Sequence, residues 1–269
     1  MTPRFGLSLA SLVIPAAITS ELTGPDPSAG VKRSSRLPPA AWPRKRMSMS
    51  YDLTNPEDRK RAWNHYLWGD HGVLRLRFHN MHPVGTQGMW RANQPSPNRL
   101  AWLKDHGFKT ILNLRGTQPG LSYYDLEHEA CDRLGLAIHD LPWGSREAPY
   151  VERIEHLIEV FDSIEYPALM HCKSGADRAG IVAAMYMLLK EKAPFEEAID
   201  HLSFKYLHVK QGKTGMLDYF FEQYRLANEA GPIDFLEWVC TRYDRQAVHD
   251  DFMASWWGRL LTEKILRRE

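Results

Sequence analysis

The segment from Pro167 to Leu189, PALMHCKSGADRAGIVAAMYMLL, changes character twice. An apolar run typical of a buried strand ends at Cys172, six small or charged residues follow, and an apolar helical pattern continues after Arg178. In a tight turn between a strand and a helix, several backbone N–H groups point toward one spot at the positive end of the helix dipole. The segment therefore predicts an anion-binding loop at the carboxyl end of a strand.

Three side chains predict what this loop does to a bound anion. Gly175 permits the tight turn, and the planar guanidinium of Arg178 can bind two oxygens of a phosphate at once. The positive field of the loop favours the thiolate form of Cys172 over the thiol. A thiolate beneath a bound tetrahedral phosphate is a nucleophile directed at phosphorus. The predicted chemistry is attack of Cys172 on a phosphate ester.

The spacing of cysteine and arginine is a weak signal by itself, because the chain contains 34 Lys and Arg residues. The other two cysteines, Cys131 and Cys240, have Ala137 and Gln246 at the same offset. The preceding strand, the glycine inside the loop and the apolar helix after it make the pattern specific. The alternative interpretation is a buried structural cysteine beside a surface arginine.

Strand-like and helical runs alternate on the N-terminal side of this loop. The strand-like runs are GMWRANQPSP, FKTILNLRG, LAIHDLP and PALMHC, and the helical runs are PNRLAWLKDHG, SYYDLEHEACDRLG and YVERIEHLIEVFDSI. We expect a first helix from Pro56 to Trp68 after the capping residue Asn55, and further helices at 195–207, 215–229, 232–243 and 246–266. The alternation predicts an α/β fold with a mainly parallel central sheet flanked by helices, and then a helical C-terminal extension.

The ends of the chain differ from this regular part. Residues 1–50 are expected to form a disordered leader or linker, residues 51–230 the main domain, and residues 231–269 a helical extension packed on it. Phe5–Ile18 is an apolar run that a signal peptide could contain, and a start at Met47 or Met49 is another interpretation. The basic clusters of residues 19–50 predict a solvated tail or, alternatively, a membrane-surface contact. The aromatic run FMASWWGRLL predicts helix packing, with a partner or membrane face as the alternative.

Composition excludes several classes of function. The net charge is +1, so nothing in the overall charge predicts nucleic-acid binding. Three cysteines without a CxxC pair predict neither a disulfide framework nor a zinc site, and they favour a reducing, cytoplasmic compartment. His65, His71, His79 and His82 lack metal-ligand spacing. We expect no metal and no cofactor.

The stretch HCKSGADRAG resembles the signature loop of the cysteine-dependent protein tyrosine phosphatases, in the dual-specificity and related atypical bacterial-type branch. The resemblance extends from about Met89 to Arg225, and WRANQPSPNRLAWLKDHGFKTILNLRG is similar to the opening of atypical members. It implies a phosphatase domain at residues 51–230 that hydrolyses phosphomonoesters without a metal. It also implies that Cys172 forms a phosphocysteine and that Arg178 binds phosphate and stabilises the transition state. His171 would help to set the pKa of the Cys172 thiol. The oxygens would be held by the backbone of Lys173, Ser174, Gly175, Ala176, Asp177 and Arg178.

Two positions depart from the family pattern. The family usually has Ser or Thr after the arginine, where its hydroxyl helps the thiolate to leave, and this chain has Ala179. Ser174 or a neighbouring group is the candidate substitute, and a slow second step is the alternative. The Trp-Pro-Asp stretch that carries the family's general acid is absent from the sequence, and three candidates for that proton donor remain, namely Asp140 at a predicted strand end, Asp177 inside the loop and Glu147.

The substrate class stays open at this stage. We expect a phosphorylated protein, lipid or sugar, and Lys173, Arg146 and Lys213 favour an acidic, multiply charged one. The resemblance implies that LHVKQGKTG touches substrate or positions water through Lys210, Gln211 and Lys213, with an exposed basic turn as the alternative. The first rival hypothesis is a catalytically impaired phospho-binding module. The second is a sulfurtransferase or arsenate-type reductase, which would favour another loop length or a nearby resolving cysteine.

Overall fold

A computed structural model describes residues 51–266, with side chains as far as Trp256. The predicted leader at residues 1–50 lies outside the described residues. The centre of the described part is a five-stranded sheet with the strand order β1-β2-β5-β3-β4. Its strands are β1 (His82–Val84), β2 (Met89–Asn93), β3 (Thr110–Asn113), β4 (Ala137–Asp140) and β5 (Ala168–Cys172). Only the β1–β2 pairing within this sheet is antiparallel, so the prediction of a mainly parallel sheet is confirmed.

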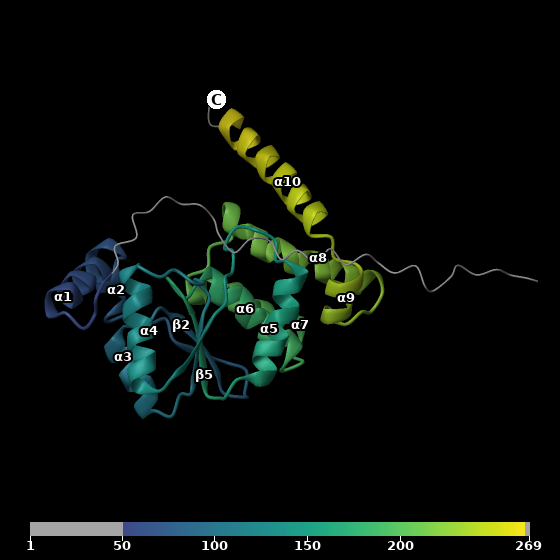
Figure 1. The fold of residues 1–269 in the computed structure, drawn as a ribbon. Helices are drawn as coiled ribbons and strands as arrows, with labels where there is room; N and C mark the ends of the chain where they lie inside the picture. The colour runs from purple at the N-terminus through teal and green to yellow at the C-terminus, as the bar shows by residue number, and fades with distance from the viewer. Residues whose placement is uncertain (1–50, 267–269) are drawn as a thin grey trace, which may run out of the picture. The chain divides into compact units, whose positions relative to one another are not determined.

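Helices cover both faces of the sheet (Figure 1). Neighbouring residues of a strand point to opposite faces. Accordingly, Ile111 and Leu169 belong to one apolar cluster with α3 (Pro97–Asp105) and α4 (Ser122–Leu134). Leu112 and Met170 belong to a second cluster with α5 (Val151–Ser163) and α6 (Asp177–Leu189). The central strand β5 is therefore buried on both faces and ends at Cys172 inside the domain.

Local sequence signals explain where several of these elements begin and end. The Asn55 side chain accepts from the N–H groups of Glu57 and Asp58 and caps α1 (Pro56–Asn64), as predicted. The helical winding then continues as the π-helix η1 (His65–Gly69), so the predicted first helix has two parts. Gly135 ends α4 at φ 63°, in the left-handed conformation that glycine adopts at low cost. Three short elements were not predicted, namely α2 (Gly72–Arg75), β1 and the single turn η4 (Lys213–Gly215).

The prediction of one helix at residues 195–207 is wrong. The chain instead forms three short pieces, α7 (Phe195–Ile199), η2 (Asp200–Leu202) and η3 (Phe204–Tyr206). His201 and Tyr206 are both buried, and both contact Arg91 of β2. A continuous helix would hold these two side chains at helical spacing, on different faces, and could not direct both at Arg91. Tertiary contacts of a buried arginine therefore override the helical pattern here.

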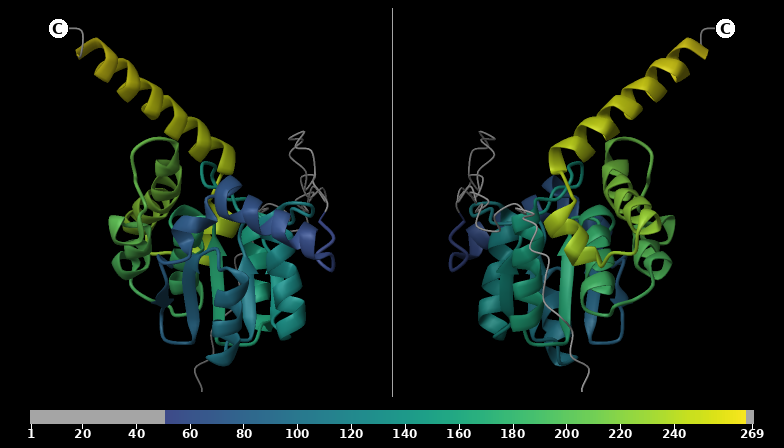
Figure 2. Two further views of the ribbon diagram at one scale, coloured as in Figure 1. Left: turned by 90° about the vertical axis from the view of Figure 1, so that its left-hand side faces the viewer. Right: turned by 90° about the vertical axis from the view of Figure 1, so that its right-hand side faces the viewer.

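The remaining helices follow the signature loop in sequence. They are η4 (Lys213–Gly215), α8 (Met216–Ala230), α9 (Phe235–Thr241) and α10 (Arg245–Leu266). The buried residues Phe235 and Trp238 of α9 share the apolar cluster of α6 and α8. The start of α10 packs on α8 through Val248 and Phe252, and the helix then extends away from the sheet (Figure 2). Among the described helices, none has both the length and the apolar character that a bilayer crossing demands.

Candidate active site

The predicted anion loop lies between β5 and α6, and its geometry follows from two positions. Cys172 ends β5 and is 2% exposed, while Arg178 is the second residue of α6 and is half-buried. Gly175 has φ +74°, and a Cβ atom on it would lie 2.6 Å from the backbone nitrogen of Asn93. No other residue type fits this turn without displacing β2, so the glycine fixes the path of the loop.

Arg91 of β2 supports the loop from inside the domain. This side chain is fully buried and donates to the carbonyl oxygens of Gly175 at 2.7 Å, Ala176 at 3.0 Å and His201 at 2.6 Å. Burial lowers the pKa of Arg91 to about 10, although negative charge on nearby acidic groups opposes this shift. Sequence reasoning missed Arg91, although an arginine inside an otherwise apolar strand was a visible signal.

Arg91 also sets the direction of the amide groups in the loop. A peptide unit is planar and trans, so its C=O and N–H bonds point in opposite directions. Because the carbonyls of Gly175 and Ala176 point toward Arg91, the N–H groups of Ala176 and Asp177 point away from it. The N–H of Ala176 makes only a long contact, 3.4 Å, with the Ser174 hydroxyl. These donors are therefore available to an anion above the loop.

Asn80 ties the loop to two other segments. Its Nδ2 group donates to the carbonyl oxygens of Ser174 and Tyr206, both at 3.1 Å. Asn80 is 4% exposed and has φ 42°, an unusual conformation for a residue other than glycine. The turn before β1 and the helical turn η3 are thereby held against the loop. No sequence signal pointed to this contact.

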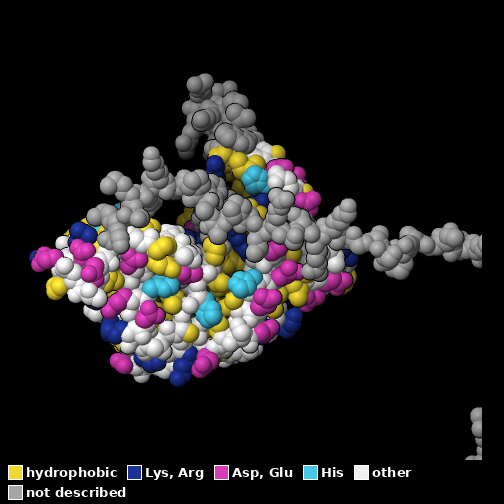
Figure 3. Space-filling model, in the orientation of Figure 1, with side chains coloured by type: hydrophobic (Ala, Val, Ile, Leu, Met, Phe, Trp, Pro, Cys, Tyr) yellow, Lys and Arg dark blue, Asp and Glu magenta, His cyan; other side chains and the backbone are white. Residues whose placement is uncertain are grey.

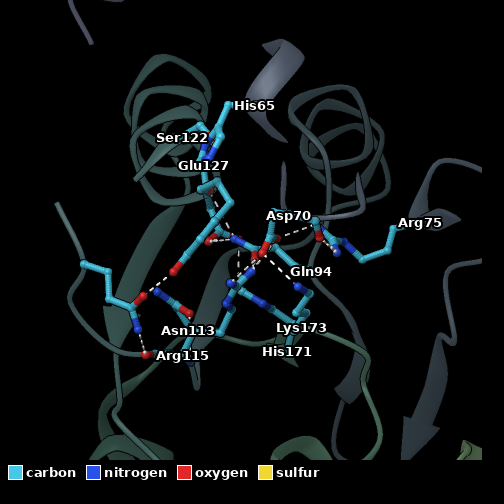
Figure 4. A network of polar contacts seen from close by, with 12 residues as sticks. His65, Asp70, Arg75, Gln94, Asn113, Arg115, Ser122, Glu127, His171 and Lys173 are labelled. Atoms are coloured by element: carbon cyan, nitrogen blue, oxygen red, sulfur yellow. Dashed lines mark hydrogen bonds and ion pairs between the residues drawn. The ribbon is translucent and has the colours of Figure 1, made fainter. Parts of the chain in front are cut away.

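A network of charged side chains, most of them buried, surrounds Asp70 and reaches the loop at Lys173 (Figure 4). Asp70, after η1, lies 3.1 Å from Nζ of Lys173 and also binds Arg75 at 2.7 Å and Arg115 at 2.9 Å. Burial would raise the pKa of Asp70, but hydrogen bonds from Arg115 and the charges of Arg115, Arg75 and Lys173 lower it to about 2. Asp70 thus holds Lys173 of the loop, while Arg75 and Arg115 neutralise the carboxylate.

The same network continues to His171, immediately before the cysteine. Nε2 of His171 lies 2.8 Å from Oε1 of Glu127 in α4, and both side chains are buried. Oε2 of Glu127 accepts a hydrogen bond from Gln94 at 2.8 Å, and Gln94 in turn accepts one from Arg115. The residue before Cys172 therefore lies against a buried carboxylate that the sequence did not single out.

Asp140 ends β4, and β3 lies between it and β5. Its two oxygens accept hydrogen bonds from Asn113 at 2.7 Å and from the Tyr124 hydroxyl at 2.6 Å, and His128 lies 3.2 Å away. Burial would raise its pKa, but the hydrogen bonds from His128, Tyr124 and Asn113 lower it to about 2. Asp140 is thus an ionised carboxylate with both oxygens occupied.

Glu147 lies in the loop between β4 and α5 and is paired with two arginines. Oε1 lies 3.2 Å from Arg153, and Oε2 lies 3.6 Å from Arg245 of α10. Arg146 beside it is exposed. These pairs join Glu147 to α5 and α10, and no contact with the signature loop appears among the described residues.

Asp177 shares a buried histidine with α8. Nδ1 of His208 lies 2.8 Å from Oδ1 of Asp177, and its Nε2 lies 2.8 Å from Oδ2 of Asp218. Lys210 contacts the other oxygen of Asp218 at 3.3 Å. Burial would lower the pKa of His208, but hydrogen bonds to Asp177 and Asp218 raise it to about 9. His208 is an imidazolium at neutral pH, and its side chain is fully buried.

Lys210, Gln211 and Lys213 all lie exposed in the segment that follows His208. Ala179, in the first turn of α6, is fully buried and supplies no hydroxyl to the sulfur. Within the described residues, no cluster of His, Cys, Asp and Glu side chains has the arrangement of a metal site.

Similarity to known proteins agrees with the geometry of this loop. Residues 80–215 match the family described as "DSP-PTPase phosphatase fused to NAD+ Kinase". Two relatives are NAD kinase 2, chloroplastic, of Arabidopsis thaliana, 29% identical over 99 residues, and probable NAD kinase 2, chloroplastic, of Oryza sativa subsp. japonica, 30% identical over 99 residues. Each alignment covers 36% of this chain and 10% of the relative, so the chain spans about a tenth of the relatives' length.

Solved structures with a related chain path are more distant. TpbA of P. aeruginosa is 17% identical, with 55% of this chain and 90% of that chain covered and a TM-score of 0.44. Tk-PTP in its active form is 16% identical, with 54% and 97% covered and a TM-score of 0.41. The family match includes β1 to β5, the signature loop and the His208 segment, and it covers half of the chain. The chain therefore belongs to this family of dual-specificity-type cysteine phosphatases, the branch to which its signature loop pointed.

Proposed function

We propose that this protein hydrolyses phosphomonoesters through a phosphocysteine intermediate on Cys172. The observation that carries the proposal is the pair of hydrogen bonds that Arg91 donates to the carbonyl oxygens of Gly175 and Ala176. With these carbonyls turned toward Arg91, the loop N–H groups face away from it, in the turn that joins Cys172 to the N-terminus of α6. Phosphate oxygens are the ligands that such a ring of donors binds best.

The first chemical step uses the loop as an anion site. The Cys172 thiolate attacks phosphorus, the bond from phosphorus to the leaving oxygen breaks, and the S–P bond forms. Arg178 and the loop amides bind the three equatorial oxygens as charge redistributes over them. Water then attacks phosphorus and releases inorganic phosphate, and the thiolate is restored.

The leaving oxygen needs a proton, and we assign its delivery to Asp177 together with His208. Asp140 and Glu147 are each occupied by other partners, as the ion pairs and hydrogen bonds above describe. Asp177 lies in the loop itself and shares the proton of the His208 imidazolium at 2.8 Å. The Asp177 carboxyl group would give this proton to the leaving oxygen and leave His208 neutral. Water consumed in the second step returns a proton to the pair.

A second candidate is a phospho-binding module of the same fold that turns over very slowly. Ala179 favours it, because a buried alanine cannot donate a hydrogen bond to the departing thiolate. A hydrogen bond to a charged group is worth about 1.5–3 kcal/mol, so its loss would slow breakdown of the intermediate by about ten- to a hundredfold.

Phosphate release from a panel of phosphopeptides, phosphorylated lipids and sugar phosphates tests the proposal. We expect turnover by the wild-type protein and by Cys240→Ser, whose exposed cysteine lies in α9. Cys172→Ser should bind phosphate but release none from any substrate. Turnover by Cys172→Ser at the wild-type rate would contradict the covalent mechanism. Phosphate binding without turnover by the wild-type protein would instead support the binding module.

A further inference from the structure

Most of the exposed large apolar side chains lie in two segments that are linked to the signature loop. Ten such side chains are exposed in the part of the chain with described side chains, and eight of them lie in residues 68–78 and 204–209. We call these two stretches the rim segments. Their exposed apolar residues are Trp68, Val73, Leu74, Leu76, Phe78, Phe204, Leu207 and Val209, and Phe204, Leu74 and Trp68 are 77%, 70% and 69% exposed.

Both rim segments are joined to the loop, the first by Asp70 and the second through Asn80. Asp70, between Trp68 and Val73, binds Lys173 at 3.1 Å. Asn80, two residues after Phe78, binds the carbonyl oxygens of Ser174 and Tyr206 at 3.1 Å. Asn80 thus links the second rim segment to the loop, and Asp70 links the first. The exposed apolar side chains therefore accompany the candidate active site.

The charges of the rim segments have one sign at the surface. Arg77 and Lys205 are exposed within them, and Lys210 and Lys213 are exposed just after the second one. Two of these cations have acidic partners outside the segments, since Lys205 lies 3.6 Å from Asp200 and Lys210 lies 3.3 Å from Asp218. The acidic residue of the segments, Asp70, is 6% exposed and is neutralised by its three cationic partners. Elsewhere acidic and basic side chains are interspersed, as the face in Figure 3 shows, and the whole chain has a net charge of +1.

We propose that the rim segments bind the surface of an anionic phospholipid bilayer and bring the signature loop to phosphate groups there. Aromatic and aliphatic side chains enter the boundary between headgroups and acyl chains, and lysine and arginine are attracted to anionic lipids. Exposed large apolar side chains that gather in segments beside a candidate site mark an interaction surface more often than scattered ones do. The cationic rim favours a bilayer over a second copy of this chain, since two copies of the rim would repel each other. The binding part of this inference goes beyond the proposed phosphatase activity and does not depend on turnover.

Sedimentation of the 269-residue chain with lipid vesicles tests the proposal. The chain carries Cys172→Ser, so that any turnover cannot alter the lipids during the measurement. We expect it to sediment with vesicles of phosphatidylcholine and phosphatidylserine and to remain largely in solution with phosphatidylcholine alone. Added salt should weaken the binding, because the attraction to anionic lipids is screened.

Two pairs of variants locate the binding surface. Leu74→Glu with Phe204→Glu is compared with Leu226→Glu, an exposed apolar residue of α8. Arg77→Glu with Lys205→Glu is compared with Lys109→Glu and Lys192→Glu, which lie before β3 and after α6, at the other end of the sheet. Each rim pair should weaken partitioning at least about tenfold, since one cation near the membrane contributes about fivefold. The control variants should bind vesicles as tightly as the chain that carries Cys172→Ser alone.

Three results would overturn the proposal. The first is a chain that stays in solution with both kinds of vesicle. The second is equal binding to both kinds, which would remove the role of the cations. The third is binding that the rim variants and their controls retain alike, which would place the contact elsewhere in the chain, for example in residues 1–50. Thermal unfolding of each variant separates a lost contact from a lost fold.

Discussion

Arg91 lies fully buried under the signature loop and donates to three carbonyl oxygens, two of them in the loop. Arg91→Lys keeps the charge but cannot reproduce a planar fork that serves several acceptors at fixed angles. We expect phosphatase turnover to fall by at least about tenfold, and the free energy of unfolding to fall by about 1–3 kcal/mol per carbonyl left unpaired. Steady-state kinetics and thermal unfolding measure the two effects.

Arg99→Lys is the matched control for this substitution. Arg99 is half-buried on α3 and its guanidinium contacts Met81 and Trp102, with no contact to the loop. This variant should keep its activity. Full activity of Arg91→Lys would mean that the loop keeps its amide orientation without the arginine fork.

The identity of the proton donor is a second question at the residue scale. An activated aryl phosphate needs little protonation of its leaving oxygen, whereas an alkyl phosphate needs a good deal. Asp177→Asn should therefore slow the alkyl substrate at least about tenfold more than the aryl one. Asp140→Asn should affect both substrates equally, because its carboxylate only joins β3, β4 and α4. The opposite pattern would return the acid role to Asp140.

At the scale of elements, the connection from β5 to α6 depends on Gly175. Gly175→Ala combines an unfavourable φ with a Cβ atom 2.6 Å from the nitrogen of Asn93, so β2 and the loop must separate. Gly107→Ala has a similar φ, +85°, and open space around the new Cβ atom. It should cost only about 1–2 kcal/mol of stability. We expect a clearly larger loss of stability and a loss of phosphate binding for Gly175→Ala, measured by denaturant unfolding and phosphate titration. Equal losses in the two variants would show that the close approach to β2 is unimportant.

The sequence predicted most of these elements because their signals are local. The strand at residues 168–172, the caps at Asn55 and Gly135, and the tight turn at Gly175 are all readable from neighbouring residues. The prediction of a helix at residues 195–207 was wrong because His201 and Tyr206 both contact Arg91, which lies about a hundred residues earlier in the chain. The contacts of Asn80, Glu127 and His208 were missed for the same reason, since each joins segments far apart in sequence.

At the scale of the whole molecule, His208 links the site to stability. Its pKa of about 9 in the folded protein lies above the ordinary value of 6.5. A raised pKa stabilises the fold fully below about pH 6.5, and this contribution is lost as the pH rises through 9. We expect roughly 2 kcal/mol of stability at neutral pH to depend on it.

Thermal unfolding between pH 6 and about 9.5 measures this contribution. The difference in Tm between the wild-type protein and His208→Gln should shrink as the pH rises. His249→Gln, at an exposed histidine of α10, should follow the wild-type protein at every pH. A difference for His208→Gln that is independent of pH would mean that the imidazolium charge does not stabilise the fold.

Trapping the covalent intermediate tests the central claim most directly. The wild-type protein is mixed rapidly with an aryl phosphate, quenched in denaturant at mildly alkaline pH, where the S–P bond survives, and digested, and the peptides are weighed by mass spectrometry. We predict that one phosphoryl group is found on the peptide that contains Cys172, and that neither Cys131 nor Cys240 carries one. Rapid substrate turnover with an unmodified Cys172 at every quench time, or with the phosphoryl group on another residue, would contradict the mechanism.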